Sequence, residues 1–326
     1  MPTDPSPSSG TVSARRLVSV VVPAFNEEDN IEAVHAAISE VFAELPGYRH
    51  ELILVDDGSS DSSMERIRAL AARCPDVFFL ELSRNFGHQQ ALGAGLRYAR
   101  GEAVISLDAD LQHPPHLIPG MIRCWENGAE VVHTVREDDP GLPALKRATS
   151  RGFYRMLNLL SDQGLEPGTA DFRLLDRKVV DVLNSLRERN PFLRGLAAWV
   201  GFRQEFLHYR PDPRHAGLSK YTVHKMMRLA LEGITSFSVK PLYFAVYAGL
   251  IFAGLSLLFV PYVLVSVALG RAVSGWASIL MAIAFFGGLQ LIVLGIIGIY
   301  LGKLFMQAKM RPSFIIRSTN LPDPPP

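Results

Sequence analysis

Short apolar runs alternate with segments of helical periodicity along the first two thirds of the chain. Four runs have the length and branched side chains of buried strands: LVSVVVPAF (17–25), HELILVDD (50–57), VFFLEL (77–82) and AVISLDAD (103–110). The first helical segment opens at Asn26, a residue type that favours helix starts. Strands that alternate with helices predict an α/β domain with a mostly parallel sheet, covered by helices on both faces.

Two later runs are apolar throughout. No Asp, Glu, Lys or Arg occurs in 244–269 or 277–301, and each run is long enough to cross a hydrocarbon core of about 30 Å as a helix. The link GRAVSG carries only Arg271, whereas several cations flank the pair: Lys225, Arg228, Lys240, Lys303, Lys309, Arg311 and Arg317. The positive-inside rule therefore predicts a two-helix transmembrane hairpin over 241–303 with both chain ends in the cytoplasm. The alternative is a buried helix pair in a soluble protein.

Three further segments complete the predicted organisation. Residues 1–16 are rich in Pro and Ser and lack the apolar core of a signal peptide, so we expect a disordered leader. Residues 221–240 are expected to form an amphipathic helix that lies in the plane of the lipid headgroups. The alternative is an amphipathic helix that packs on the soluble domain. The cytoplasmic C-terminal tail is 304–326. Gly298 and Gly302 form a small-xxx-small pair, which favours a homo-oligomer.

Charge and cysteine content narrow the class of protein. The formal net charge is +1, so no overall field favours binding to nucleic acid. The two cysteines, Cys74 and Cys124, lie far apart and do not show metal-ligand spacing. We therefore expect ordinary burial for Cys74 and a reducing compartment for the domain.

Acidic residues follow three of the predicted strands. Glu27 comes after the first, Asp56 and Asp57 end the second, and Asp108 and Asp110 end the last. Ligands of such sheets bind beyond the carboxyl ends of the strands. Residues i and i+2 of a strand point to the same side, so the last two carboxylates are expected to meet at one point. A polar strand exit with a turn-forming Asp is the alternative.

The type of these acids indicates a ligand. Asp110 and the side-chain carbonyl of Gln112 are hard oxygen donors, which suit Mg²⁺ or Mn²⁺ better than zinc. The chain has no G-x-x-x-x-G-K-[ST] loop, and GAG at 93–95 lacks dinucleotide-fingerprint spacing. Carboxylates can accept hydrogen bonds from a base and a ribose, and can hold a divalent ion that carries a diphosphate. This combination suits a nucleotide sugar.

An ordered set of motifs now adds a resemblance. The motifs are PAFNEE, VDDGSSD, RNFGHQQALGAGL, DADLQHPP, DFRLLDR, RGLAAWVGF and RHAGLSKY. Together with the apolar pair they resemble the polyprenyl-phosphate glycosyltransferases of glycosyltransferase family 2, which include bacterial undecaprenyl-phosphate sugar transferases and dolichyl-phosphate mannose synthases. The resemblance implies a cytoplasmic GT-A-type nucleotide-sugar-binding domain over 17–220. His116 departs from the pattern, because the family has an acid after the two prolines.

The resemblance also implies roles for individual residues. Those expected to border the nucleoside are Pro23, Phe25, Glu27, Asp56 and Asp57. Asp108, Asp110 and Gln112 would serve the diphosphate and metal, and Arg214 and Lys220 would close over the diphosphate. The expected acceptor-phosphate residues are Arg136, Lys146, Ser150 and Arg173, although a solvated basic helix is the alternative for the segment that holds the first three. Asp171 is expected as a base or an organiser of the acceptor, with an Asx turn or helix cap as its alternative.

The predicted activity is that of a metal-dependent hexosyltransferase. A single sugar would move with inversion from a nucleotide sugar to undecaprenyl (polyprenyl) phosphate, at the cytoplasmic face of the inner membrane, for modification of cell-envelope glycans. UDP-glucose is favoured as donor, while UDP and GDP stay open, as do Mg²⁺ and Mn²⁺. One alternative is a processive membrane polysaccharide synthase, but the chain lacks the Gln-x-x-Arg-Trp motif and has only two apolar runs. The other is a catalytically idle membrane adaptor.

Overall fold

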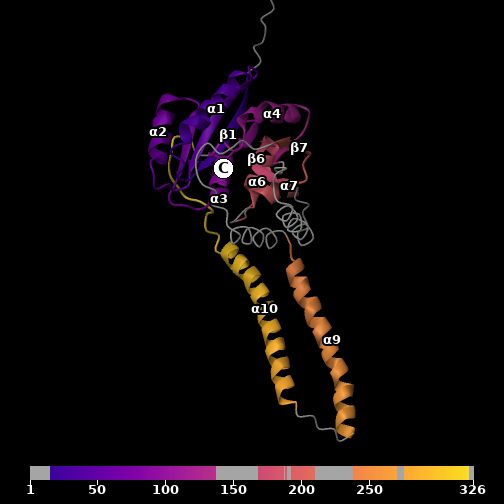
Figure 1. Cartoon of the computed structure of the whole chain (residues 1–326). Coiled ribbons are helices and arrows are strands. Elements are labelled where there is room, and N and C mark those ends of the chain that lie inside the picture. The colour runs from indigo at the N-terminus through magenta and orange to yellow at the C-terminus, as the bar shows by residue number, and fades with distance from the viewer. Residues whose placement is uncertain are drawn as a thin grey trace, which may run out of the picture. The chain divides into compact units, whose positions relative to one another are not determined.

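The structure is a computed structural model that describes residues 15–136, 168–186, 188, 192–209, 238–269 and 275–322. The chain divides into two compact units (Figure 1). The first comprises 1–140, 168–219 and 313–326, and the second comprises 141–167 and 220–312. Residues 1–14 of the predicted leader 1–16 and nearly all of the predicted amphipathic segment 221–240 lie outside the described residues. The leader was predicted slightly too long, because Arg16 is the first residue of a strand.

The first unit is built on an eight-stranded sheet in the order β7-β5-β6-β4-β1-β2-β3-β8. Its strands are β1 (Arg16–Ala24), β2 (Tyr48–Asp56), β3 (Val77–Leu82), β4 (Ala103–Ser106), β5 (Val131–Arg136), β6 (Thr169–Asp176), β7 (Gln204–Tyr209) and β8 (Ile316–Thr319). β1 pairs in parallel with β2 and β4, β2 with β3, and β5 with β7. β6 and β8 pair antiparallel with their neighbours. The predicted α/β fold with a mostly parallel sheet is confirmed.

The central strands β1 and β4 are almost entirely buried, as expected of strands that helices cover on both faces. The helices of this unit are α1 (Ile31–Ala43), α2 (Ser63–Arg73), α3 (His88–Tyr98), the short 3₁₀ helix η1 (Pro115–Leu117), α4 (Ile118–Glu126), α6 (Arg177–Ser185) and α7 (Leu193–Trp199). Val20 and Val22 of β1 belong to the buried cluster that includes the apolar face of α1. Val21 points to the other face, where its Cγ1 lies so close to Gly95 of α3 that a Cβ there would be 2.2 Å away. A side chain at position 95 would therefore push α3 off the sheet.

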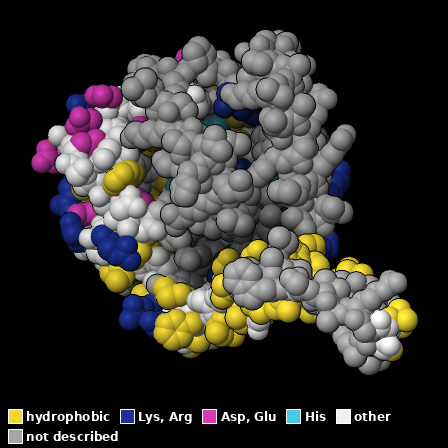
Figure 2. Space-filling view, turned by 60° about the horizontal axis from the view of Figure 1, so that its bottom comes forward, with side chains coloured by type: hydrophobic (Ala, Val, Ile, Leu, Met, Phe, Trp, Pro, Cys, Tyr) yellow, Lys and Arg dark blue, Asp and Glu magenta, His cyan; other side chains and the backbone are white. Residues whose placement is uncertain are grey.

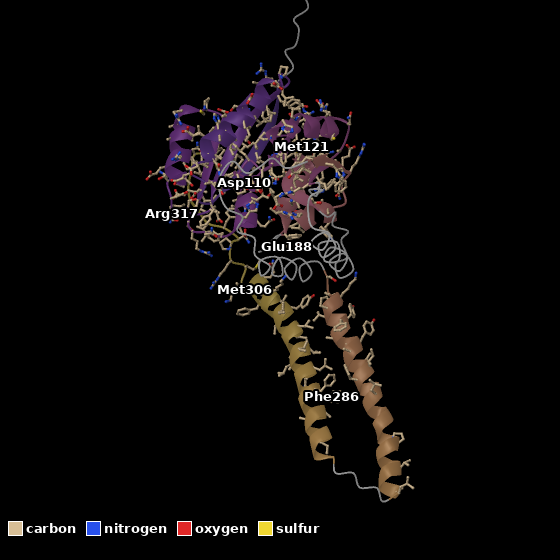
Figure 3. All side chains as sticks on the ribbon, in the orientation of Figure 1. Asp110, Met121, Glu188, Phe286, Met306 and Arg317 are labelled. Atoms are coloured by element: carbon tan, nitrogen blue, oxygen red, sulfur yellow. The ribbon has the colours of Figure 1, made fainter. Side chains whose placement is uncertain are left out.

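The C-terminal segment adds the outermost strand on the β3 side of the sheet. β8 pairs antiparallel with β3, and Glu81 of β3 accepts hydrogen bonds from Arg68, Arg317 and Ser318. Figure 3 labels Arg317 in this position. The predicted tail 304–326 thus includes a strand that covers an edge otherwise open to pairing with other chains.

The second unit contains two long helices, α9 (Lys240–Ala268) and α10 (Trp276–Ala308). Within the part of the chain whose side chains are described, one stretch, Phe285–Ala308, is long and apolar enough to cross a membrane, with a mean hydropathy of 2.0. Apolar side chains cover the described surface of these helices (Figure 2), and Leu291 is 71% exposed. Only one of the two predicted spans is therefore supported by length and composition, and the hairpin stays a prediction.

Candidate active site

The parallel register brings the predicted acids together where the parallel strands have their carboxyl ends. Ala24 of β1 pairs with Asp56 of β2, and Val21 pairs with Ser106 of β4, so the three strands end side by side. β6 runs antiparallel, and its Arg173 pairs with Ser106. The start of β6, which carries Asp171, therefore reaches the same edge, which we call the site edge. Asp110, labelled in Figure 3, lies in the loop that follows β4.

The loops after β1 and β2 are joined by hydrogen bonds. Asn26 adopts φ 55°, and this left-handed turn lets its backbone N–H donate to Ser59 Oγ at 3.0 Å. Its side-chain Oδ1 accepts from the Ser60 N–H at 2.9 Å. Glu27 is half-buried beside this junction, and Phe25 is 44% exposed. The ring of Phe25 is thus available to a planar ligand. Pro23 is buried within β1.

Asp56 and Asp57 are both buried but have different surroundings. Asp57 accepts hydrogen bonds from the backbone N–H groups of Phe86 (2.7 Å) and Gly87 (2.9 Å), which anchors the loop before α3. Asp56 Oδ2 accepts from the Ser59 N–H at 3.2 Å, whereas Asp56 Oδ1 is buried without a hydrogen-bond partner among the described residues. Burial raises the pKa of both carboxyls.

The Asp-Ala-Asp segment lies in a loop rather than a strand. β4 ends at Ser106, before both carboxylates, so the expected alternation of strand side chains is wrong here. Leu111 adopts φ 55°, and Asp110 Oδ1 accepts from the Gln112 N–H at 3.1 Å, so the turn itself sets the direction of Asp110. Asp108 Oδ1 is buried and makes no hydrogen bond within the described part of the chain.

Asp171 is the most heavily paired acid of the site edge. It accepts from Arg173 Nη2 at 2.6 Å, Arg194 Nη2 at 2.9 Å and Gln89 Nε2 at 3.3 Å. Burial opposes its ionisation, but Arg194, His88 and Arg173 outweigh burial and hold the pKa of Asp171 well below its usual range. Asp171 is therefore ionised at neutral pH and is a weak base.

His88, the first residue of α3, lies between two of these acids. Its Nε2 is 3.5 Å from Asp108 Oδ1 and 3.7 Å from Asp171 Oδ2. Partial burial opposes a charge on the ring, but the hydrogen bond to Asp171 and both carboxylates raise the pKa of His88 to about 9. The site edge thus contains a third cation beside the two arginines.

The two described residues predicted to hold the acceptor phosphate differ in exposure. Arg173 is only 2% exposed, and its guanidinium also donates to the carbonyl oxygens of Leu193 and Ala170. Burial lowers the pKa of Arg173 to about 10, so it stays charged at neutral pH. Arg136 is exposed at the end of β5, where it pairs with Tyr209 of β7. Burial raises the pKa of Tyr209 to about 12.

Four predicted site residues lie outside the described part of the chain: Lys146, Ser150, Arg214 and Lys220. Conversely, the structure brings His88, Gln89 and Arg194 to the site edge, for which the sequence predicted no role. All three lie in motifs that carry the resemblance, RNFGHQQALGAGL and RGLAAWVGF. The motifs were recognisable, but the contacts with Asp171 depend on how α3 and α7 fold back onto β6.

Comparisons with known proteins give one family. The model of "Glycosyl transferase family 2" matches residues 19–183. The chain is 42% identical over 302 residues to an uncharacterized glycosyltransferase of Bacillus subtilis, with 92% of this chain and 93% of that protein covered. It is 41% identical to the bactoprenol glucosyl transferase of Shigella phage SfII, with 94% and 99% covered. The family resemblance of the motifs is confirmed.

A solved structure also matches the chain. Glucosyl-3-phosphoglycerate synthase from Mycobacterium tuberculosis, crystallised with phosphoglyceric acid, is 24% identical with a TM-score of 0.45. The match covers 68% of this chain and 79% of that one.

Proposed function

This chain belongs to glycosyl transferase family 2, and we propose that it transfers one glucose from UDP-glucose to undecaprenyl (polyprenyl) phosphate. Relatives of about the same length whose names specify bactoprenol and glucosyl transfer support the acceptor and the sugar. The transfer inverts the anomeric carbon by a single displacement. Its product is a lipid-linked sugar for modification of cell-envelope glycans.

One structural observation carries the proposal. At the site edge, Asp56 Oδ1 and Asp108 Oδ1 are buried and make no hydrogen bond among the described residues. Buried carboxylate oxygens without hydrogen bonds are costly, and they persist where a ligand or ion completes them; the His88 ring, 3.5 Å from Asp108 Oδ1, compensates part of that charge. Asp56 pairs with Ala24, the residue before the exposed Phe25, and an exposed ring suits a nucleoside, whereas Asp108 precedes Asp110 and Gln112 in the same loop.

The loop after β4 also fits a divalent cation. Asp110 and Gln112 offer carboxylate and amide oxygens, and the buried Asp108 Oδ1 lies close to them in sequence. Asp110 and Gln112 would hold Mg²⁺ or Mn²⁺, which compensates the charge of the departing nucleoside diphosphate. Arg214 and Lys220 are proposed to add positive charge to the same leaving group.

The acceptor needs little activation by the protein. A phosphate monoester has a second pKa of about 6, so its oxygen is a nucleophile at neutral pH without a general base. Asp171, held ionised by two arginines, suits a positioning role better than proton removal. Arg136, Lys146 and Ser150 are proposed to bind the acceptor phosphate, while buried Arg173 holds Asp171 in place.

We further propose that α9 and α10 span the inner membrane as a hairpin, with the catalytic unit and both chain ends in the cytoplasm. The Phe252 ring of α9 contacts Phe285 and Phe286 of α10 at centroid distances of 5.5 and 5.8 Å, and Figure 3 labels Phe286. The Tyr300 hydroxyl donates to the Ser238 carbonyl at 2.6 Å. Reporter fusions at Arg16 and Arg317 should report a cytoplasmic location. A fusion within 270–275 should report the opposite side of the membrane. A C-terminus on the far side would contradict the hairpin.

The activity is tested by incubating the purified full chain with undecaprenyl phosphate and a panel of UDP- and GDP-sugars, with Mg²⁺, Mn²⁺ or EDTA. We expect a single lipid-linked glucose from UDP-glucose, and only with a divalent ion. A polymeric product would favour the processive synthase, and lack of turnover with every donor would favour the idle adaptor. Either result would overturn the proposal.

A further inference from the structure

A second group of metal-ligand-type side chains lies near the amino-terminal ends of β2 and β3, opposite the site edge. His35 of α1, Cys74 at the end of α2 and Asp76 before β3 each present a donor atom, and the three atoms lie within 4.8 Å of one another. All three residues are half-buried. We call them the far-edge cluster.

His50 of β2 adds a fourth polar group. Its Nε2 lies 3.0 Å from Asp76 Oδ2, and His35 Nε2 lies 3.8 Å from the same oxygen. The His50 ring stacks on Phe42 with a centroid distance of 4.6 Å, which fixes its plane. His50 Nε2 is buried and makes no hydrogen bond of good geometry with any described residue. Two imidazoles thus converge on one carboxylate, with a thiol alongside.

We propose that His35, Cys74 and Asp76 bind one zinc-class divalent ion and that His50 orients Asp76. Nitrogen, sulfur and oxygen donors suit Zn²⁺, in contrast to the oxygen donors near Asp110. Zinc–ligand distances of about 2.0–2.3 Å place ligand atoms about 3.5 Å apart, so the cluster must contract by about 1 Å, which side-chain rotation can provide. A histidine that contacts a ligating carboxylate fits the usual outer shell of such sites.

The ion would act as a structural clamp. It joins α1 to the connection between α2 and β3, and His50 brings in β2. His50 precedes Asp56 by six residues on β2, which separates the two edges by about 20 Å at about 3.3 Å per residue. The ion therefore lies too far from the site edge to contact the sugar donor. Sequence spacing did not indicate this site, because only Cys74 and Asp76 are near each other in sequence.

The test uses the metal-stripped full chain, titrated with Co²⁺ as a spectroscopic probe and then with Zn²⁺ as competitor. Cobalt bound to a thiolate gives a charge-transfer absorption that oxygen sites such as that of Asp110 lack. We expect one thiolate-bound cobalt per chain, displaced by an equivalent of zinc. Cys74→Ser should abolish the absorption, whereas the matched variant Cys124→Ser should retain it. Circular dichroism of both variants checks that the chain still folds.

Three further variants separate a built site from a lone thiol. His35→Gln and Asp76→Asn should each weaken cobalt binding by at least about a hundredfold, and His50→Gln by about ten- to a hundredfold, as for loss of an outer-shell partner. Absence of the absorption in the unaltered chain would overturn the proposal. Equal cobalt affinity in His35→Gln, Asp76→Asn and the unaltered chain would also overturn it, because binding would then be that of an adventitious ion only.

Discussion

Glu51 and Asp56 lie on the same strand, β2, and each is 2% exposed, but their oxygens are used differently. Glu51 accepts from Ser19 Oγ at 2.6 Å, from the Arg100 backbone N–H at 2.8 Å and from Arg100 Nε at 2.9 Å. Asp56 accepts at Oδ2, while its Oδ1 has no partner among the described residues.

The difference separates scaffold from site. A buried carboxylate whose hydrogen bonds are complete stabilises the fold, and its neighbours are protein groups. A buried oxygen without a partner costs about 1–3 kcal/mol, so the fold is less stable for keeping it. At the site edge this applies to Asp56, whereas Asp108 Oδ1 has the His88 ring at 3.5 Å but no hydrogen bond among the described residues. The ligand is expected to make the missing bonds. Substitutions near Glu51 should therefore affect stability, and substitutions near Asp108 should affect turnover.

The largest effect is expected from Asp110→Asn. Loss of a charged metal ligand should lower kcat about a thousandfold, which corresponds to about 4 kcal/mol of barrier. Asp110 is half-buried in an open loop, so the free energy of unfolding should change by less than about 0.5 kcal/mol. Steady-state kinetics and urea denaturation measure the two quantities. The exposed Asp181→Asn is the control and should leave both unchanged. A near-normal rate in Asp110→Asn would remove the metal site from this loop.

The next effect concerns acid stability at the site edge. Burial and the neighbouring Arg173 lower the pKa of His133 on β5 to about 4. The unfolded state, with a histidine pKa of about 6.5, therefore binds the proton first, and stability falls as the pH drops from about 6.5 to about 4. The loss between pH 7 and 4.5 should be about 2–3 kcal/mol, at about 1.4 kcal/mol per pKa unit.

His133→Gln removes this titration. Urea titrations at pH 7 and pH 4.5 measure the free energy of unfolding. On acidification this free energy should fall less in the variant than in the unaltered chain, by up to about 2–3 kcal/mol. His208→Gln, an exposed histidine on β7, is the matched control and should behave like the unaltered chain. An identical pH dependence of stability in all three proteins would show that His133 is not held neutral by its surroundings.

Arg100→Met tests the scaffold side of the comparison. It leaves Glu51 buried without its guanidinium partner and removes the contact of Arg100 with the Phe78 ring at 4.7 Å. Because 43% of the Arg100 side chain is exposed and water can replace part of the pairing, we expect a loss of about 2 kcal/mol in unfolding free energy. The exposed pair of Arg73 and Glu32 provides the control, and Arg73→Met should cost less than about 1 kcal/mol. A drop in kcat of Arg100→Met would contradict the division between a scaffold role for Glu51 and a ligand-binding role for Asp56.

The sheet was predictable because it depends on local pattern. Apolar runs of strand length alternate with helical periodicity, and this alone indicates a mostly parallel sheet with its acids at one edge. β8 was not predictable in the same way. Its four residues, Ile316–Thr319, carry no strong strand pattern, and β8 forms because β3 leaves an open edge. The strand predicted over 103–110 was too long. β4 ends at Ser106, and Asp108 and Asp110 lie in the loop that turns at Leu111.

The site was predictable in its acids and less so in its cations. Asp56 ends β2, and Asp108 and Asp110 follow β4, so topology alone brings these acids together. His88 and Arg194 come from helices that are 106 positions apart in the sequence, and they meet only through Asp171 on β6. The far-edge cluster is similar, because no spacing rule links His35 to Cys74. Contacts between distant elements require the folded arrangement.

The smallest effect, and the sharpest for the nucleoside side of the site edge, is expected from Phe25→Ala. Phe25 is 44% exposed and follows Ala24, the partner of Asp56 in the sheet, and stacking of an aromatic ring on a base contributes about 1 kcal/mol beyond area burial. The KM for the nucleotide sugar should rise about three- to tenfold with kcat unchanged, because the contact is made equally in the ground and transition states. Phe206→Ala removes a ring of similar exposure (45%) from β7 and should leave the KM unchanged. If Phe25→Ala lowered kcat and left the KM for the donor unchanged, the base would lie elsewhere, and Asp56 would lose its assigned ligand.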